Sequence, residues 1–500
     1  MKANFFKRNL IVSLLNVVFQ FLQSLWITAY VQRMMGIEAY GYVSVIVSIV
    51  NMAGVVTVAL TSVCSRYMIC ELETGDSAKA KKVFCTIQSV LLVLSLLCML
   101  VFVIMAINIT GIINVSPQYE QQVKILMLIV TADFVLQLLQ VPYISVLYYE
   151  EKVYYYYIMQ ILTNISKVLC VVVIFNAWKP VLWGSHIGVL LAAGCSLVFY
   201  YCYVRKKYPY LSLSIKSFDR FKLMEILSSG IWVSLSKLAA TLLASCSTFL
   251  VNILIGTYLA GIYGSVSQIQ SILSFVTISV VNVFLPQMLK LYSLNEIDEL
   301  INFTKQGLKI ISSFLGIVAG IFVVLGDDFM ALWITEEYLQ YNALIIISVC
   351  YLSITYAAEF VNQLLIALNK TKVPAIVSIV AGIGNVLLIV FLVKGCDMGI
   401  YGVAVSQMIV LSFRSGIFFP VYAAKCLNQK WNAYLGKQLS GVLVTGVATL
   451  ICMIVNKIIP VEGWISLFFV GGITVIMTLG VILCCDKETR KFVINMVKER

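Results

Sequence analysis

Charged residues are scarce in this sequence of 500 residues. They make up 12% of the chain, whereas hydrophobic residues make up 61% and the mean hydropathy is +0.98. A soluble domain holds about 25% charged residues, so this chain has too little polar surface to face water on all sides. A helix needs about 20 apolar residues to cross a bilayer, and runs of that kind recur along the whole chain. The sequence predicts an all-α integral membrane protein with about fourteen transmembrane helices.

Motifs for metals and nucleotides are also missing. His186 is the single histidine, and the 14 cysteines form no CxxC pair or Cys/His cluster. Most cysteines lie inside apolar runs, where cysteine behaves as a small hydrophobic residue. The loops are short and contain no P-loop, which excludes a pump with its own ATPase domain. We therefore expect no metal site, no cofactor and no enzymatic activity.

The positive charge of the chain points to membrane topology. The formal net charge is +12, but no basic stripe with interleaved aromatic residues is present, which excludes nucleic acid as a partner. Most of the 35 Lys and Arg residues lie in alternate short loops, the pattern of cytoplasmic loops. This pattern predicts a multi-pass protein of the bacterial inner (cytoplasmic) membrane with both termini in the cytoplasm. The predicted helices are 9–32, 40–68, 83–107, 123–149, 153–176, 181–204, 225–255, 261–289, 303–325, 338–368, 373–394, 399–424, 438–457 and 463–485.

The chain contains an internal repeat. Ala132–Leu139 and Ala358–Leu365 share the pattern Ala-acid-Phe-Val-x-Gln-Leu-Leu, and shorter matches before and after them keep the same order. Each half holds six predicted helices, an even number, so the two halves have the same topology. We expect an N-lobe at 1–210 with helices 1–6 and a C-lobe at 211–430 with helices 7–12. Residues 431–500 add helices 13 and 14 and a cytoplasmic tail.

Two such lobes are typical of a transporter that binds its substrate between them and exposes it to each side in turn. Asn16 and Gln20 lie on one face of the first helix, and Lys237 and Thr241 lie at matching places on the seventh. These faces predict a water-filled cavity between the lobes. The alternatives are hydrogen bonding between helices and a bundle that only scaffolds another activity. Lys237 argues against both, because a charge at mid-bilayer costs ~2.5–3.5 kcal/mol.

Other charges inside the predicted helices leave two interpretations open. Asp133 and Glu359 occupy matching positions in the repeat and are candidates for coupling to H⁺ or Na⁺, or are structural partners of nearby bases. Lys167 and Arg414 either offer cations to an anionic substrate or neutralise those two acids. Arg66, near the inner end of the second helix, is a candidate for phosphate contact, or only extends its charge to the membrane surface.

Two features at the membrane boundaries have simple interpretations. His186 lies close to the outer end of the sixth helix, and we expect it at the interface. The tyrosine-rich run Tyr148–Tyr157 is typical of an aromatic belt at the inner interface, with stacking on sugar rings as a second possible use.

Several short motifs follow one another in an order that is more specific than any one of them. They are Arg8-Asn9-Leu10, Gly36 before Tyr40-Gly41, Ser65-Arg66-Tyr67, and the charged loop from Glu71 to Lys82. With two six-helix lobes and a terminal helix pair, the whole chain resembles the polysaccharide flippases of the multidrug/oligosaccharidyl-lipid/polysaccharide (MOP) exporter superfamily.

This resemblance implies transport of a polyprenyl-diphosphate-linked oligosaccharide from the cytoplasmic to the periplasmic leaflet. The transported oligosaccharide would be a unit of O-antigen, capsule or exopolysaccharide. The partners would be membrane lipids, a polysaccharide polymerase and other assembly proteins. The diphosphate needs cations, for which Lys237, Lys167, Arg414 and Arg66 are candidates, whereas Asn16, Gln20 and Thr241 suit sugar hydroxyls.

Two rival functions remain. A multidrug or cation antiporter of the same superfamily would usually have twelve helices and an acidic cavity, which the extra helix pair and the lysines argue against. A membrane-embedded polymerase or ligase would be expected to carry a long outer loop with catalytic residues. The longest outer loop here, about 108–122, is short and has neither Arg nor His.

Overall fold

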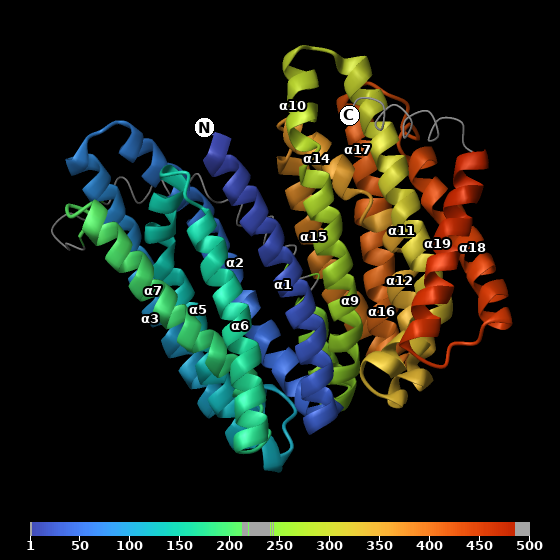
Figure 1. Ribbon diagram of the computed structural model, residues 1–500, viewed down its shortest axis with the longest axis horizontal. Helices are drawn as coiled ribbons and strands as arrows, with labels where there is room; N and C mark the ends of the chain where they lie inside the picture. Colours follow the sequence, from blue (N-terminus) through green and yellow to red (C-terminus); the bar gives the residue numbers. More distant parts are fainter. Residues whose placement is uncertain (1–2, 213–218, 220–240, 242, 244, 486–500) are drawn as a thin grey trace. The chain divides into compact units, whose positions relative to one another are not determined.

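The protein consists of long α-helices joined by short connections (Figure 1). The computed structural model describes residues 3–212, 219, 241, 243 and 245–485. In this described part, thirteen helical spans are long and apolar enough to cross a membrane. The predicted helix 225–255 lies partly outside the described residues, and its described end, Ser245–Leu254, is a short apolar helix. The predicted fold class, all-α with about fourteen membrane helices, is confirmed.

The chain folds as two compact units, Met1–Gly264 and Ser265–Arg500, and the boundary between them lies inside one helix, α9. The lobes predicted from the repeat, at 1–210 and 211–430, rest on sequence similarity rather than on packing, and they stay a prediction. The described helices of unit 1 are α1 (Ala3–Met35), α2 (Ile37–Glu73), α3 (Ser77–Ile107), α4 (Ile109–Ile112), η1 (Pro117–Tyr119), α5 (Glu120–Tyr149), α6 (Tyr154–Ala177) and α7 (Gly184–Lys207), followed by Ser245–Leu254 and the start of α9 (Thr257–Asn282).

Among the described residues, the helices of unit 2 have more breaks than those of unit 1. Its elements are the rest of α9, α10 (Leu285–Ser293), α11 (Ile297–Trp333), η3 (Glu336–Tyr341), α12 (Asn342–Val349), α13 (Leu352–Thr355), α14 (Glu359–Ala367), α15 (Lys372–Val390), the π-helix η4 (Phe391–Gly395), α16 (Gly399–Leu411), the π-helix η5 (Ser412–Phe418), α17 (Phe419–Cys426), α18 (Leu435–Ile458) and α19 (Trp464–Cys485).

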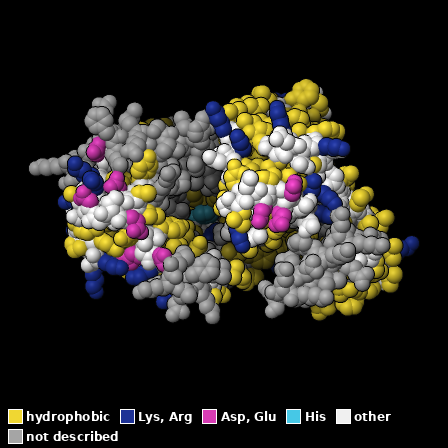
Figure 2. Space-filling model, turned by 90° about the horizontal axis from the view of Figure 1, so that it is seen from above, with side chains coloured by type: hydrophobic (Ala, Val, Ile, Leu, Met, Phe, Trp, Pro, Cys, Tyr) yellow, Lys and Arg dark blue, Asp and Glu magenta, His cyan; other side chains and the backbone are white. Residues whose placement is uncertain are grey.

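Apolar side chains cover much of the outside of both units. On α3, for example, Val93, Leu96 and Leu100 are exposed, although water would be a poor solvent for such a surface. Charged side chains gather at the ends of the helices instead, where Figure 2 shows them among apolar ones. This distribution fits helices that pass through lipid and end in water.

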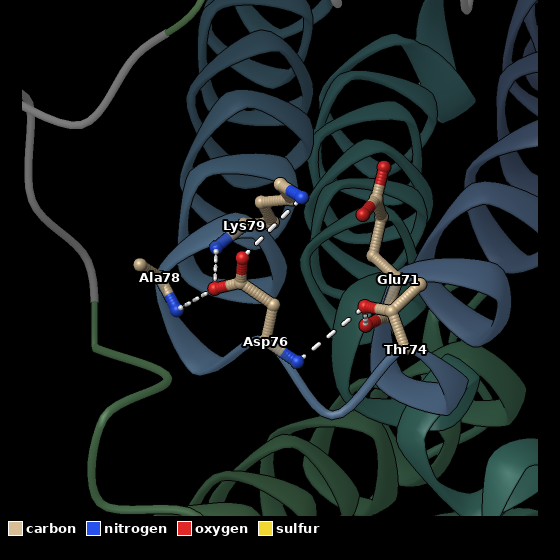
Figure 3. A network of polar contacts seen from close by, with 5 residues as sticks. All are labelled: Glu71, Thr74, Asp76, Ala78 and Lys79. Carbon is tan, nitrogen blue, oxygen red and sulfur yellow. Dashed lines mark hydrogen bonds and ion pairs between the residues drawn. The ribbon is translucent and has the colours of Figure 1, made fainter.

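The turn between α2 and α3 shows how the polar ends are built (Figure 3). Asp76 is the N-cap of α3, and its Oδ1 accepts hydrogen bonds from the amides of Lys79 (3.1 Å) and Ala78 (3.0 Å). Thr74 Oγ1 donates to the carbonyl oxygen of Glu71 (2.7 Å) and so closes the end of α2. The bond from the Lys79 amide, with help from Ala78 and the Lys79 ammonium, holds the pKa of Asp76 below its usual value. The carboxylate therefore stays charged and keeps capping the helix.

The predicted helix 13, observed as α18, packs closely on α11 in unit 2. Small residues line the contact: a Cβ on Gly316 would lie 2.5 Å from the carbonyl oxygen of Gly441, and a Cβ on Gly320 would lie 2.6 Å from Cβ of Ala448. A Cβ on Gly441 would overlap Oγ of Ser312 and lie 2.7 Å from its carbonyl oxygen. Close approach of this kind is a main source of helix association in membranes, because lipid gives no hydrophobic drive between helices.

We expect Gly441→Leu to destabilise the protein by about 1–3 kcal/mol or more, because its side chain must push two backbones apart. Gly446→Leu is the matched control on the same helix, since a Cβ there meets no atom within 4 Å. Thermal unfolding of the detergent-solubilised protein measures the difference. Equal Tm values for the two variants would contradict the tight α11–α18 contact.

Candidate functional site

Asp133 is the most deeply buried acid of the candidate site. It lies on α5 in unit 1, and it is 9% exposed. Its Oδ2 accepts a hydrogen bond of 2.8 Å from Nε2 of Gln137, one turn further along the helix. Its Oδ1 is buried and has no hydrogen-bond partner among the described residues. A buried carboxylate oxygen without a donor is costly, so the position is suited to a proton or a cation.

A lysine from a neighbouring helix lies near Asp133, and a histidine from the next helix lies near that lysine. Lys167 on α6 is half-buried and attracts Asp133 electrostatically, but the two do not form an ion pair within 4 Å. His186, near the start of α7, experiences the charge of Lys167, and its Nδ1 lies 2.9 Å from Oγ of Ser185. Helices α5, α6 and α7 therefore bring three titratable groups into one region of unit 1.

Unit 2 contains a second cluster of this kind. Glu359 is the first residue of α14, and its Oε2 accepts a hydrogen bond of 3.1 Å from Nδ2 of Asn362. Arg414 lies in the π-helix η5, donates from Nε to Oγ of Ser378 (2.7 Å) and covers the ring of Phe419 at 4.8 Å. Glu359 and Arg414 attract each other electrostatically, again without an ion pair within 4 Å. Each acid thus has a base within electrostatic reach, and the roles of these charges toward each other, an ion or a substrate stay a prediction.

The backbone around the second cluster is irregular. The predicted helix 338–368 is broken into η3, α12, α13 and α14, and the two helices that follow it contain the π-helices η4 and η5. The corresponding helices of the first half, α5, α6 and α7, run without such breaks. Breaks and π turns inside membrane helices are tolerated where protein or a cavity surrounds them, and they are frequent at functional sites. The sequence reasoning missed this difference between the halves.

The remaining predicted residues are only partly described. Asn16 on α1 is half-buried, and its Oδ1 has no hydrogen-bond partner among the described residues, whereas Gln20 is exposed. Thr241 is half-buried. Lys237 and the side chain of Arg66 lie outside the described residues. The predicted polar cavity between the lobes therefore stays a prediction.

The tyrosine-rich run packs at one end of unit 1. Glu150 lies at the end of α5 and forms ion pairs with Lys207 (2.8 Å) and Lys152 (3.1 Å). It also accepts a hydrogen bond from the Tyr203 hydroxyl (2.6 Å). Burial raises the pKa of Glu150, but the contacts with these three side chains lower it more, so the pKa lies below its usual value. The Tyr154 ring carries the guanidinium of Arg8 at 3.9 Å. These contacts hold the ends of α1, α5, α6 and α7 together, and the predicted aromatic belt at the membrane interface stays a prediction.

The described residues contain no group of three or more His, Cys, Asp or Glu side chains placed to hold a metal ion. Two partners of the charged residues could have been predicted from spacing alone. Gln137 lies four residues after Asp133, and Asn362 lies three residues after Glu359, both on the same helix face. Ser378 could not have been predicted as a partner of Arg414, because it lies on another helix.

Comparison with known proteins decides the family. The profile of the family described as "Polysaccharide biosynthesis protein" matches residues 6–292, more than half of the chain. The chain belongs to this family. A relative from Bacillus subtilis (strain 168), described as the uncharacterized membrane protein EpsK, is 26% identical over 498 residues, which cover 99% of this chain and 97% of that protein.

Solved structures identify the fold of this polysaccharide biosynthesis protein. The lipid II flippase MurJ in its inward closed conformation matches with a TM-score of 0.70 and 15% identity, over 95% of this chain and 98% of that one. An inward-facing multidrug resistance MATE family transporter of the MOP superfamily matches with a TM-score of 0.68 and 13% identity, over 83% and 94%. At this identity the matches show the fold alone. The predicted resemblance to the flippases of the MOP superfamily is confirmed in the fold, and the family match places the chain among polysaccharide biosynthesis proteins.

Proposed function

We propose that this protein moves a polyprenyl-diphosphate-linked oligosaccharide from the cytoplasmic to the outer leaflet of the bacterial inner (cytoplasmic) membrane. The released unit would serve O-antigen, capsule or exopolysaccharide assembly by a polymerase and other partner proteins. The family match over residues 6–292 carries the proposal, because it ties a multi-pass membrane chain to polysaccharide synthesis. Transport rather than bond chemistry is proposed, since the fold is that of flippases and transporters.

Alternating access assigns a role to each group of polar residues. The anionic diphosphate would contact cations at the cavity, and the sugar would bind hydroxyl and amide groups, while the polyprenyl tail stays in lipid. The acids Asp133 and Glu359 would bind and release H⁺ or Na⁺ as the lobes move. The proposed cations are Lys237, Lys167, Arg414 and Arg66, and the proposed sugar contacts are Asn16, Gln20 and Thr241.

A multidrug or cation antiporter is the second candidate, because a MATE transporter matches the fold nearly as well as MurJ does. Organic cations need acidic cavity walls. Here the acids Asp133 and Glu359 each have a base close enough to attract them, Lys167 and Arg414 respectively. The net charge offered to a ligand is therefore small or positive, which favours an anionic head group.

Reconstituted proteoliposomes test the proposal. A fluorescent polyprenyl-diphosphate oligosaccharide is placed in the membrane, and a quencher that cannot cross the bilayer reports the fraction in the outer leaflet over time. We expect vesicles with the protein to exchange the lipid between leaflets in minutes and empty vesicles to do so far more slowly. Protein that leaves the lipid in place but drives the uptake or efflux of an organic cation dye would support the antiporter instead.

A further inference from the structure

A cavity of about 380 Å³ opens in unit 2 where η5 meets the start of α18. Its walls include Ile354 at the end of α13, Ile417 of η5, and Trp431, Gly436 and Leu439 around the start of α18. The volume lies within the range of about 300–1,000 Å³ that small-molecule sites have. The space next to Gly436 is open, since a Cβ on this residue would meet no atom within 4 Å, and a larger side chain there would extend into the cavity. We call this space the α17–α18 cavity.

The α17–α18 cavity faces the outside of the helices. Its wall residues Trp431, Leu439 and Ile417 are 67%, 56% and 51% exposed, and the wall is almost entirely apolar. On a membrane helix such side chains contact lipid. Trp431 sits in the connection between α17 and α18, where an aromatic ring is typical of the membrane–water boundary. A hydrocarbon chain is therefore the chemistry that this wall can bury.

Positive charge is concentrated in the chain segments next to the cavity-lining residues. Lys425, Lys430 and Lys437 lie at or beside the α17–α18 connection, and the sequence has no acid between Asp397 and Glu462. Lys425 and Lys430 are exposed, and neither forms an ion pair with a described residue. Basic groups at the membrane surface attract anionic lipids by roughly 1 kcal/mol each.

Gln438 is the buried one of the three polar residues that line the cavity, which also include Ser412 and Asn432. Gln438 is 2% exposed, and its Nε2 donates to the carbonyl oxygen of Ile354. Its Oε1 is buried and has no hydrogen-bond partner among the described residues. The amide therefore ties α18 to α13 behind the apolar wall, and a charged head group would be held by the lysines instead.

We infer that the α17–α18 cavity is a binding site for an anionic phospholipid of the phosphatidylglycerol class. One acyl chain lies along Gly436 and Leu439, and the phosphate lies between Lys425 and Lys430. The bound lipid contacts η5, the π-helix that also carries Arg414. Occupancy of the site would thereby hold η5 in place beside the charged cluster of unit 2. This inference does not depend on which substrate the protein transports.

Native mass spectrometry of the purified full-length protein tests the inference with phosphatidylglycerol and phosphatidylcholine of identical acyl chains. We expect one tightly bound phosphatidylglycerol, with about tenfold preference over phosphatidylcholine. Gly436→Leu fills the cavity and should weaken phosphatidylglycerol binding about tenfold or more. Gly446→Leu, on the same helix but outside the cavity, should bind as the unchanged protein does, because a Cβ there also meets open space.

A second set of variants tests the contact between the lysines and the lipid head group. The double variant Lys425→Gln/Lys430→Gln should lose the preference for phosphatidylglycerol and keep its weaker binding of phosphatidylcholine. Lys457→Gln, at the other end of α18, is the control and should keep the preference.

Three results would overturn the inference. Gly436→Leu could bind phosphatidylglycerol unchanged, or Gly446→Leu could lose binding to the same extent. Polyprenyl phosphate could displace phosphatidylglycerol at equal concentration, which would assign the cavity to the tail of a transported lipid. If Gly436→Leu fails to fold, Gly436→Ala must show a smaller loss of binding in the same direction, and unchanged binding there would equally reject the site.

Discussion

Asp133→Asn and Glu359→Gln are expected to accumulate in the membrane at normal levels, and at least one of them should lose transport together with its dependence on pH or Na⁺. Each replacement keeps the shape of the side chain but removes the group that can exchange a proton or hold a cation. Oδ1 of Asp133 has no described donor, and Glu359 begins a half-helix in an irregular segment. Both positions therefore suit an ion that comes and goes.

The measurement is lipid exchange in proteoliposomes with an imposed pH or Na⁺ gradient. Glu120→Gln and Glu336→Gln are matched controls, because these acids lie at helix ends. Glu120 forms a half-buried pair with Lys124 at 2.6 Å. If the acids only fix packing, the single variants should fail to accumulate, because breaking a buried pair costs about 3–5 kcal/mol. A second change, such as Lys167→Met with Asp133→Asn, would then restore the level. Transport with unchanged ion dependence in both single variants would also reject the coupling role.

Lys237→Ala is expected to abolish surface polysaccharide while the protein still reaches the membrane. The predicted helix 225–255 would place Lys237 inside the bilayer, where a charge costs ~2.5–3.5 kcal/mol. Such a lysine needs a compensating role, and an anionic diphosphate supplies one. Lys237 lies outside the described residues, and the prediction rests on its place in the repeat, which matches that of Asn16. Lys237→Arg should keep part of the activity, because it retains the charge and changes the donor geometry.

Surface polysaccharide and the amount of membrane-inserted protein are measured together in cells that depend on this protein. Lys457→Ala is the control, since this lysine lies at a helix end. Normal polysaccharide from Lys237→Ala would remove Lys237 from the substrate site. Equal activity of the alanine and arginine variants would show that its charge has no role.

The sequence by itself determined the class of the protein and the approximate place of its helices. A bilayer requires about 20 apolar residues for each crossing helix. Because this requirement applies to every helix separately, each membrane helix can be recognised from its own stretch of sequence. The predicted range 438–457 and the observed α18 (Leu435–Ile458) differ by only a few residues. The repeated pattern around Asp133 and Glu359 also pointed to the two acids before any contact was known. Gln137 follows from the same local rule, since a residue four positions away lies on the same helix face.

Only the tertiary structure decided the features that depend on two or more helices. The bond from Arg414 to Ser378 joins η5 to α15, and no spacing in the sequence relates these residues. The breaks in the predicted helix 338–368 were equally hidden, because hydropathy does not distinguish a continuous apolar helix from a broken one that surrounding protein stabilises. Gly441 and Gly436 lie on the same helix, yet a Cβ on the first would meet Ser312 and the second faces an open cavity. The difference between them is set by what packs against each face, and packing is a property of the folded chain.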